Sequence, residues 1–190
     1  MTCGDNDAMP ELSVPVARVR ESFVDAMDEF RAEGRGDPDD STVTGFLMRE
    51  HARAWATAET FEQFVNWLRA QALEETPRSD GFVPATELWW IDGDAFLGRI
   101  QVRHRLTPLL LEVGGHVGYD IRPSARRQGH ATAMLRAALP IANGLGIDPA
   151  LITCDATNMA SRLVIERNGG TLEDERFGKL RYWVATAPPS

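Results

Sequence analysis

Few residues in this chain are of the types that mark a secreted, membrane-spanning or metal-stabilised protein. Only two of its 190 residues are cysteines, Cys3 and Cys154. Two are too few for a disulfide framework or a zinc site, so reduced thiols and no metal are expected. No apolar run approaches the roughly 20 residues of a bilayer-spanning helix, and the opening MTCGDNDAMP lacks the basic and apolar regions of a secretory signal. These absences predict a cytoplasmic protein without a membrane partner.

Basic residues are also in the minority. The chain has 20 Lys and Arg against 28 Asp and Glu, a formal net charge of -8. This excess of negative charge argues against nucleic acid as a partner and favours a cationic small molecule. Hydrophobic residues make up 43% and charged residues 25%, which is an ordinary globular composition. The length suits one compact domain over 1–190.

Helical patterns come first along the chain. A helical spacing of apolar residues is present at Val19, Phe23, Met27 and Phe30, and it predicts a first amphipathic helix. A second helical region is expected over 42–57, and a third helix after the capping-box pair Thr60 and Gln63. The buried stripe expected on the third helix contains Phe61, Phe64, Val65, Leu68 and Ala72.

Strand patterns dominate the rest. Period-two alternation between turn residues predicts strands over 86–91, 95–105, 115–121, 150–154, 171–176 and 179–185, after an early one over 12–16. Helices are expected over about 127–143 and 158–167, with a short helical turn within 107–115. Helices followed by a sheet that other helices interrupt indicate a single α/β domain.

The densest basic stretch is RPSARRQGHAT, residues 122–132, which leads into a predicted helix. The first N–H groups of a helix have no internal partner and the helix dipole makes that end positive, so an anion is favoured there. Gly129 lets the main chain approach a ligand closely, and Arg126 and Arg127 add charge-assisted hydrogen bonds. The alternative is that these arginines are merely solvated. Neither GxxxxGK[ST] nor GxGxxG is present.

The spacing Arg126-x-x-Gly129-x-Ala131 after an alternating strand resembles the pyrophosphate loop of the GNAT superfamily of acetyl-coenzyme A-dependent N-acetyltransferases. The resemblance extends along YDIRPSARRQGHATAMLRAAL and LITCDATNMASRLVIERNGG and covers about 84–185. It implies an α/β fold with a mixed, mostly antiparallel sheet of about seven strands, flanked by helices and splayed between strands four and five. It also implies an acceptor side within 12–84 and an acetyl-coenzyme A-binding core within 85–186.

The resemblance further implies how the cosubstrate acetyl-coenzyme A is held. Main-chain groups of Tyr119, Asp120 and Ile121 would pair with the pantetheine arm, and Asn158 and Ser161 would reach it from the other side. Asn158 is also a good helix N-cap in any protein. The pyrophosphate would lie in the loop formed by Arg126, Arg127, Gln128, Gly129, His130, Ala131 and Thr132.

Acetyl transfer to an amine needs a base for the amine, polarisation of the carbonyl and a proton for the leaving thiolate. His116 is the first candidate base because an imidazole titrates near neutrality, although a strand histidine can simply hydrogen-bond across the sheet. Asp120 and Glu87 are the alternatives. Many family members carry a tyrosine acid where this chain has Ile165, so Ser161, Cys154, water or unassisted departure remain open.

The acceptor is expected to bind among acidic and tryptophan-rich segments before residue 93. Carboxylates beside aromatic faces suit a cationic amine, and contacts are predicted at Trp55, Glu87 and Trp89. The neighbouring acidic residues and tryptophans are Glu50, Glu59, Glu62, Asp92, Trp67 and Trp90.

The motif order resembles a bacterial GNAT subgroup that includes aminoglycoside acetyltransferases of the kasugamycin 2'-N type, which implies an aminoglycoside acceptor and antibiotic resistance. A peptide or protein N-acetyltransferase and a non-catalytic acetyl-coenzyme A-binding module are the alternatives. Whether the chain forms a homodimer stays open.

Overall fold

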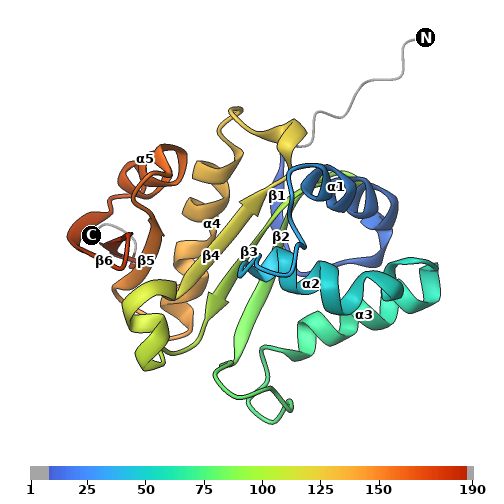
Figure 1. Ribbon diagram of the computed structural model, residues 1–190, viewed down its shortest axis with the longest axis horizontal. Helices are drawn as coiled ribbons and strands as arrows, with labels where there is room; N and C mark the ends of the chain where they lie inside the picture. The colour runs from blue at the N-terminus through green and yellow to red at the C-terminus, as the bar shows by residue number, and fades with distance from the viewer. Residues whose placement is uncertain (1–8, 188–190) are drawn as a thin grey trace.

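The computed structural model describes residues 9–187 and contains a seven-stranded sheet with helices on both faces (Figure 1). The strands are β1 (Glu11–Ser13), β2 (Ala85–Asp92), β3 (Ala95–Arg103), β4 (Val117–Ile121), β5 (Ala150–Asp155), β6 (Thr171–Arg176) and β7 (Lys179–Val184). Their order is β1-β2-β3-β4-β5-β7-β6, and only β4 and β5 are parallel. The predicted mixed, mostly antiparallel α/β fold is confirmed.

Three helices cover one face of the sheet: α1 (Arg20–Ala32), α2 (Val43–His51) and α3 (Ala58–Ala70). The other face carries α4 (His130–Gly144), and α5 (Met159–Arg167) packs beside α4 and against β5 and β7 (Figure 1). Short helical turns lie at 17–19, 52–55, 110–114 and 123–125. None of the helices in this described part of the chain is both long and apolar enough to cross a bilayer.

The core between α1, α2, α3 and the sheet is built from aromatic rings. Phe23 lies at its centre, and five ring centroids lie within 5.1–5.9 Å of its own: those of Trp55, Phe61, Phe64, Trp89 and Phe96. Tilted and edge-on aromatic contacts of this kind stabilise a core beyond the area they bury. Trp55 and Trp89 are therefore core residues, 4% and 1% exposed, and the structure corrects their prediction as substrate contacts.

The third helix begins earlier than its sequence signal indicated. Thr57 is the N-cap, and it forms a capping box with Thr60, whose side chain returns to the N-cap backbone. The pair proposed at Thr60 and Gln63 lies one turn too late, because a threonine at the third position replaced the expected Glu or Gln. Ala72 lies beyond the end of the helix and is only half-buried.

Strands β4 and β5 pair at one point and then separate. Val117 and Ile152 are their one paired position. Just before it, the His116 N–H donates to the Leu151 carbonyl oxygen at 2.7 Å, and the Leu151 N–H donates to His116 Nδ1 at 2.9 Å. Gly115 permits this approach, because a Cβ there would lie 2.6 Å from the Leu151 oxygen. Beyond this closed end the sheet is open, as the predicted splay requires.

Candidate active site

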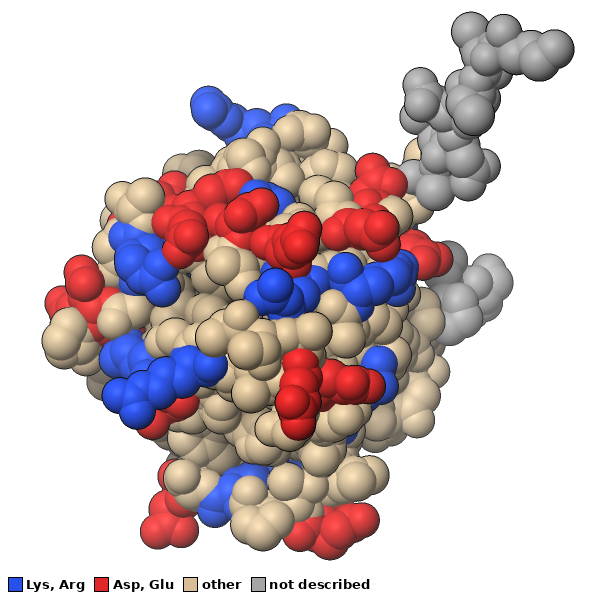
Figure 2. All heavy atoms as spheres, turned by 90° about the vertical axis from the view of Figure 1, so that its right-hand side faces the viewer, with Lys and Arg blue, Asp and Glu red and all other residues tan. Residues whose placement is uncertain are grey.

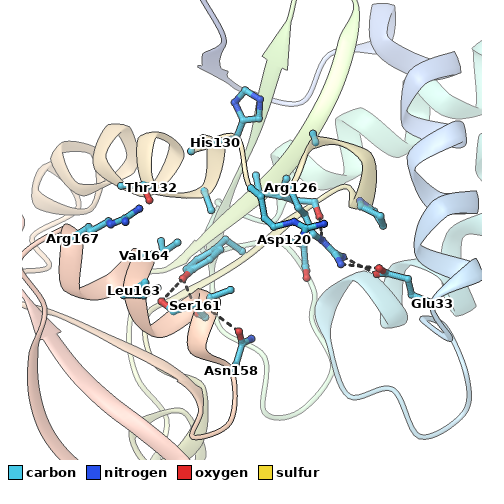
Figure 3. A pocket seen from close by; sticks show the side chains of 18 of the residues that line it. Glu33, Asp120, Arg126, His130, Thr132, Asn158, Ser161, Leu163, Val164 and Arg167 are labelled. Atoms are coloured by element: carbon cyan, nitrogen blue, oxygen red, sulfur yellow. Dashed lines mark hydrogen bonds and ion pairs between the residues drawn. The ribbon is translucent and has the colours of Figure 1, made fainter.

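A cavity of about 730 Å³ opens where β4 and β5 separate (Figure 3). Asp120 lines it from β4, His130 and Thr132 from the start of α4, and Leu163, Val164 and Arg167 from α5. We call it the splay cavity. All residues that the sequence predicted for the cofactor line it except Gln128.

The loop before α4 presents a row of free N–H groups to the splay cavity. Arg127 and Gly129 both have positive φ, +62° and +87°, a backbone conformation that aims successive N–H groups at one point. Within the described residues, no acceptor lies within hydrogen-bond distance of the N–H groups of 127–132, and the first bonded one is that of Ala133, to the Gly129 oxygen. A helix start with this geometry binds an anion such as a pyrophosphate.

Arg126 does not point freely toward that anion site. Its guanidinium donates to both carboxylate oxygens of Glu33 at 2.8 and 2.7 Å, and its Nε donates to the Ile121 oxygen at 3.1 Å. It also lies over the Phe30 ring, 5.9 Å from the centroid. The sequence predicted a direct phosphate contact, whereas in this structure Arg126 ties the loop to α1.

Arg122 ties the same loop to α1 through a second carboxylate. Its Nε donates to Glu29 at 3.0 Å, and the N–H and hydroxyl of Ser124 donate to Glu29 at 2.8 and 2.9 Å. Burial would raise the pKa of Glu29, but the hydrogen bonds from Arg122 and Ser124 outweigh it and lower that pKa. Helix α1 thus holds the loop before α4 in place.

The far wall of the splay cavity is made by α5. Asn158 is its N-cap, and its Oδ1 accepts from the Ser161 N–H at 3.0 Å, so its side-chain oxygen already has a partner. The Tyr119 hydroxyl reaches across from β4 to within 2.8 Å of Ser161 Oγ. Burial raises the pKa of Tyr119, and Ile165, at the usual tyrosine position, is buried in the core. The sequence predicted Tyr119 only through its main chain, because its hydroxyl is out of the usual register and meets Ser161 only when β4 and α5 come together.

The three candidate bases have very different surroundings. His116 does not line the splay cavity, and its Nδ1 accepts from the Leu151 N–H. Glu87 is buried and bound through both oxygens to Arg99. Asp120 lines the splay cavity and accepts from Thr44 Oγ1 at 2.7 Å and Arg35 Nη2 at 3.2 Å. This geometry favours Asp120 over His116, the first choice from sequence.

His116 instead contributes to the stability of the fold, through the hydrogen bond that its Nδ1 accepts from Leu151. Burial and the charge of Arg103 lower its pKa, so the unfolded chain binds the proton more readily than the folded protein does. The free energy of unfolding should therefore be fully present above about pH 6.5 and should decrease as the pH falls below it, because a protonated Nδ1 cannot accept from the Leu151 N–H. We expect H116A to lose about 1–3 kcal/mol, since it leaves a buried N–H unsatisfied, and its melting temperature to change less between pH 7 and 5 than that of the wild type. An identical pH slope in the two proteins, measured by calorimetry, would rule out this role.

A second cavity of about 530 Å³ lies on the face of the sheet that carries Asp120, between α2, α3 and strands β2 and β3. We call it the acceptor cavity. Trp67, Glu87 and Arg99 are among its lining residues. The other acidic residues expected to form the acceptor site lie outside it, namely Glu50, Glu59, Glu62 and Asp92.

Surface charge is not concentrated in one sign over the N-terminal helices. Figure 2 shows acidic and basic side chains in neighbouring bands on the face that contains α1 and α3. Opposite charges so close together largely cancel at a distance. Among residues 9–187 no cluster of histidine, cysteine and carboxylate side chains could hold a metal ion. Cys154 is buried, and Cys3 lies outside the described residues.

Comparisons with known proteins agree with this geometry. A family model described as an acetyltransferase (GNAT) domain matches residues 27–171. No curated protein matches the chain. The solved structure of RimL, a ribosomal L7/L12 α-N-protein acetyltransferase in complex with coenzyme A, superposes with a TM-score of 0.60 at 16% identity, covering 95% of this chain and 97% of that one.

Two further solved structures are similar. One is RimJ of Mycobacterium smegmatis with a coenzyme A disulfide, at a TM-score of 0.60 and 16% identity, with 93% and 86% of the two chains covered. The other is the microcin C7 self-immunity acetyltransferase MccE with acetyl-coenzyme A and AMP, at 0.59 and 13%, with 95% and 93% covered. At such identities the likeness to solved structures supports the fold alone, and the match to the family model supplies the assignment to a family. By its splayed sheet, its anion-binding loop and that match, the chain belongs to the GNAT acetyltransferase family.

Proposed function

We propose that this protein transfers the acetyl group of acetyl-coenzyme A to a primary amine. The observation that carries the proposal is the splay cavity. It has the free N–H groups at the start of α4 at one end, and along it the edge of β4 that faces β5 is unpaired after Val117. A long cosubstrate with a pyrophosphate and an amide-containing arm fits these two features. Residues 85–186 would form the cosubstrate core and 12–84 the acceptor side.

The residues present can perform the required proton transfers and binding. Acetyl-coenzyme A, when bound, supplies the activated acetyl group as a thioester. The N–H groups of 127–132 would hold its pyrophosphate, and the unpaired main chain of 119–121 its pantetheine arm. Asp120 would accept the amine proton, directly or through water, since it is the one candidate carboxylate that lines the splay cavity.

A pair of hydroxyl groups takes the place of the missing tyrosine at position 165. Tyr119 and Ser161 lie on opposite walls of the splay cavity and share a hydrogen bond of 2.8 Å. Because burial raises the pKa of Tyr119, its hydroxyl is a hydrogen-bond donor and a poor source of a free proton at neutral pH. It would stabilise developing negative charge between β4 and α5.

A peptide or protein N-acetyltransferase is the second candidate. RimL, whose fold is similar, is named as a ribosomal L7/L12 α-N-protein acetyltransferase, but analogy at the level of fold is a weak guide to substrate. An aminoglycoside acceptor, antibiotic resistance, a homodimer and a cytoplasmic location stay predictions from the sequence.

The proposal is tested by measuring free thiol release from acetyl-coenzyme A against a panel of amines. The panel contains aminoglycosides, polyamines, acidic and neutral amino acids and peptides with free N-termini. Release that depends on one class of amine supports the enzyme and identifies the class. Tight binding of acetyl-coenzyme A without release for any amine would instead favour the non-catalytic binding module.

A further inference from the structure

The acceptor cavity contains a half-buried cation that forms no ion pair within the described residues. Its charged lining residues are three arginines and two carboxylates: Arg78, Arg99, Arg103, Asp80 and Glu87. Glu87 is bound through both carboxylate oxygens to Arg99, and Asp80 is exposed. Neither Arg78 nor Arg103 forms an ion pair in this part of the chain, and the Arg78 guanidinium donates to main-chain oxygens of 71–74. The charges of the cavity therefore do not cancel, and Arg103 is the arginine on the strand beside Arg99.

Arg103 is held by main-chain oxygens alone. Its Nη1 donates to the carbonyl oxygens of Gly114 and Gly115 at 3.0 and 3.1 Å. No carboxylate of the described residues lies within 4.0 Å of its guanidinium. Partial burial and the neighbouring charge of Arg99 lower the pKa of Arg103 to about 10, so it stays a cation at pH 7. It lacks the ion pair that normally accompanies a charge withdrawn from water.

The free side of this guanidinium faces β4. Nη2 donates to no acceptor among residues 9–187, and it lies 3.3 Å from where a Cβ on Gly118 would be. Gly118 is two residues before Asp120 on the same strand, about 7 Å along it. A molecule of amino-acid size bound at Nη2 could therefore place its amine near Asp120, the carboxylate that would take the amine proton.

From these contacts we infer that the acceptor is an amine carrying a carboxylate, of amino-acid or dipeptide size, whose carboxylate binds Arg103. The inference rests on the proposed function and names its substrate class. It replaces the cationic acceptor expected from the sequence, because the net charge of -8 is spread over the surface while the cavity itself holds an unpaired arginine. A cavity of about 530 Å³ has room for such a molecule.

The test compares matched pairs of acceptors in which the one carboxylate is either free or amidated, namely alanine with alaninamide and glycylalanine with glycylalaninamide. We expect kcat/KM to be at least about tenfold higher for the carboxylate member, since a charge-assisted hydrogen bond in a buried site discriminates by that much or more. Aminoglycosides and polyamines should be poorer acceptors. R103Q should remove the preference and R103K should keep part of it.

Two controls separate recognition from folding. R105Q removes the neighbouring exposed arginine, which pairs with Glu74 at 2.8 Å outside the cavity, and should leave the preference unchanged. Acetyl-coenzyme A affinity, measured by calorimetry, should be the same in R103Q and the wild type. Equal kcat/KM within each pair, a preference for cations, or an equal loss for both members in R103Q would overturn the inference.

Calorimetric titration of the same pairs into protein saturated with coenzyme A gives a readout that does not need turnover. If no amine is acetylated, the proposed function fails, but tighter binding of the carboxylate member to the wild type than to R103Q still supports the inference. If amines are acetylated and the pairs bind equally, the inference fails and the proposed function stands.

Discussion

Replacing Gly129 by aspartate is expected to abolish binding of acetyl-coenzyme A. Gly129 is the N-cap of α4 with a φ of +87°, and a Cβ there would meet nothing within 4 Å, so the new side chain would extend into the open cleft. A carboxylate would then compete with the pyrophosphate for the free N–H groups of 127–132 and repel it. Calorimetry should detect no binding at concentrations that saturate the wild type.

A matched variant separates this effect from backbone strain. Gly146 has a φ of +78° and also leaves open space for a Cβ, but it follows the other end of α4 and lines neither cavity. G146D should therefore lose a similar amount of stability, on the order of 1 kcal/mol, and bind acetyl-coenzyme A normally. G129A carries the strain without the charge and should bind more weakly than the wild type but measurably. Unchanged affinity in a folded G129D protein would refute the loop assignment.

Replacing Asp120 by asparagine is expected to lower kcat by about 10²-fold or more while the affinity for acetyl-coenzyme A changes little. The amide keeps the size of the side chain and can still accept from Thr44, but it cannot take a proton from an amine, and a positioned base contributes about this factor. Steady-state kinetics with the best amine of the panel, together with calorimetry, would measure both quantities.

Two further variants test whether the carboxylate acts as a base or only holds its neighbours. T44V removes the hydroxyl that donates to Asp120 at 2.7 Å and keeps the carboxylate, so its kcat should fall much less than that of D120N. H116A should keep a kcat near that of the wild type, because His116 lies outside both cavities. If H116A loses about 10²-fold and D120N does not, the histidine is the base after all.

Local sequence patterns determined most of the secondary structure. Apolar spacing in 19–30 and alternation in 115–121 reflect which side chains must be buried, and this is a property of neighbouring residues. The loop at 126–131 was likewise identifiable, because glycine at 129 is required by a positive φ and the free N–H groups follow from the helix start itself. Its resemblance to GNAT proteins added the splayed sheet, which no pattern of neighbouring residues encodes.

The tertiary structure alone decided which side chains are free to act. The charges of Arg126 and Glu87 are evident from the sequence, but only packing brings Glu33 to Arg126 and Arg99 to Glu87. Each charged group therefore already has a partner within the protein. In the sequence Trp55 and Trp89 could equally line a pocket. In the structure both pack against the Phe23 ring and so belong to the core. No pattern along the chain distinguishes Arg103, because the lack of a counterion depends on which residues the fold brings together. The fold half-buries Arg103 beside Gly118 and places no carboxylate of the described residues in an ion pair with it.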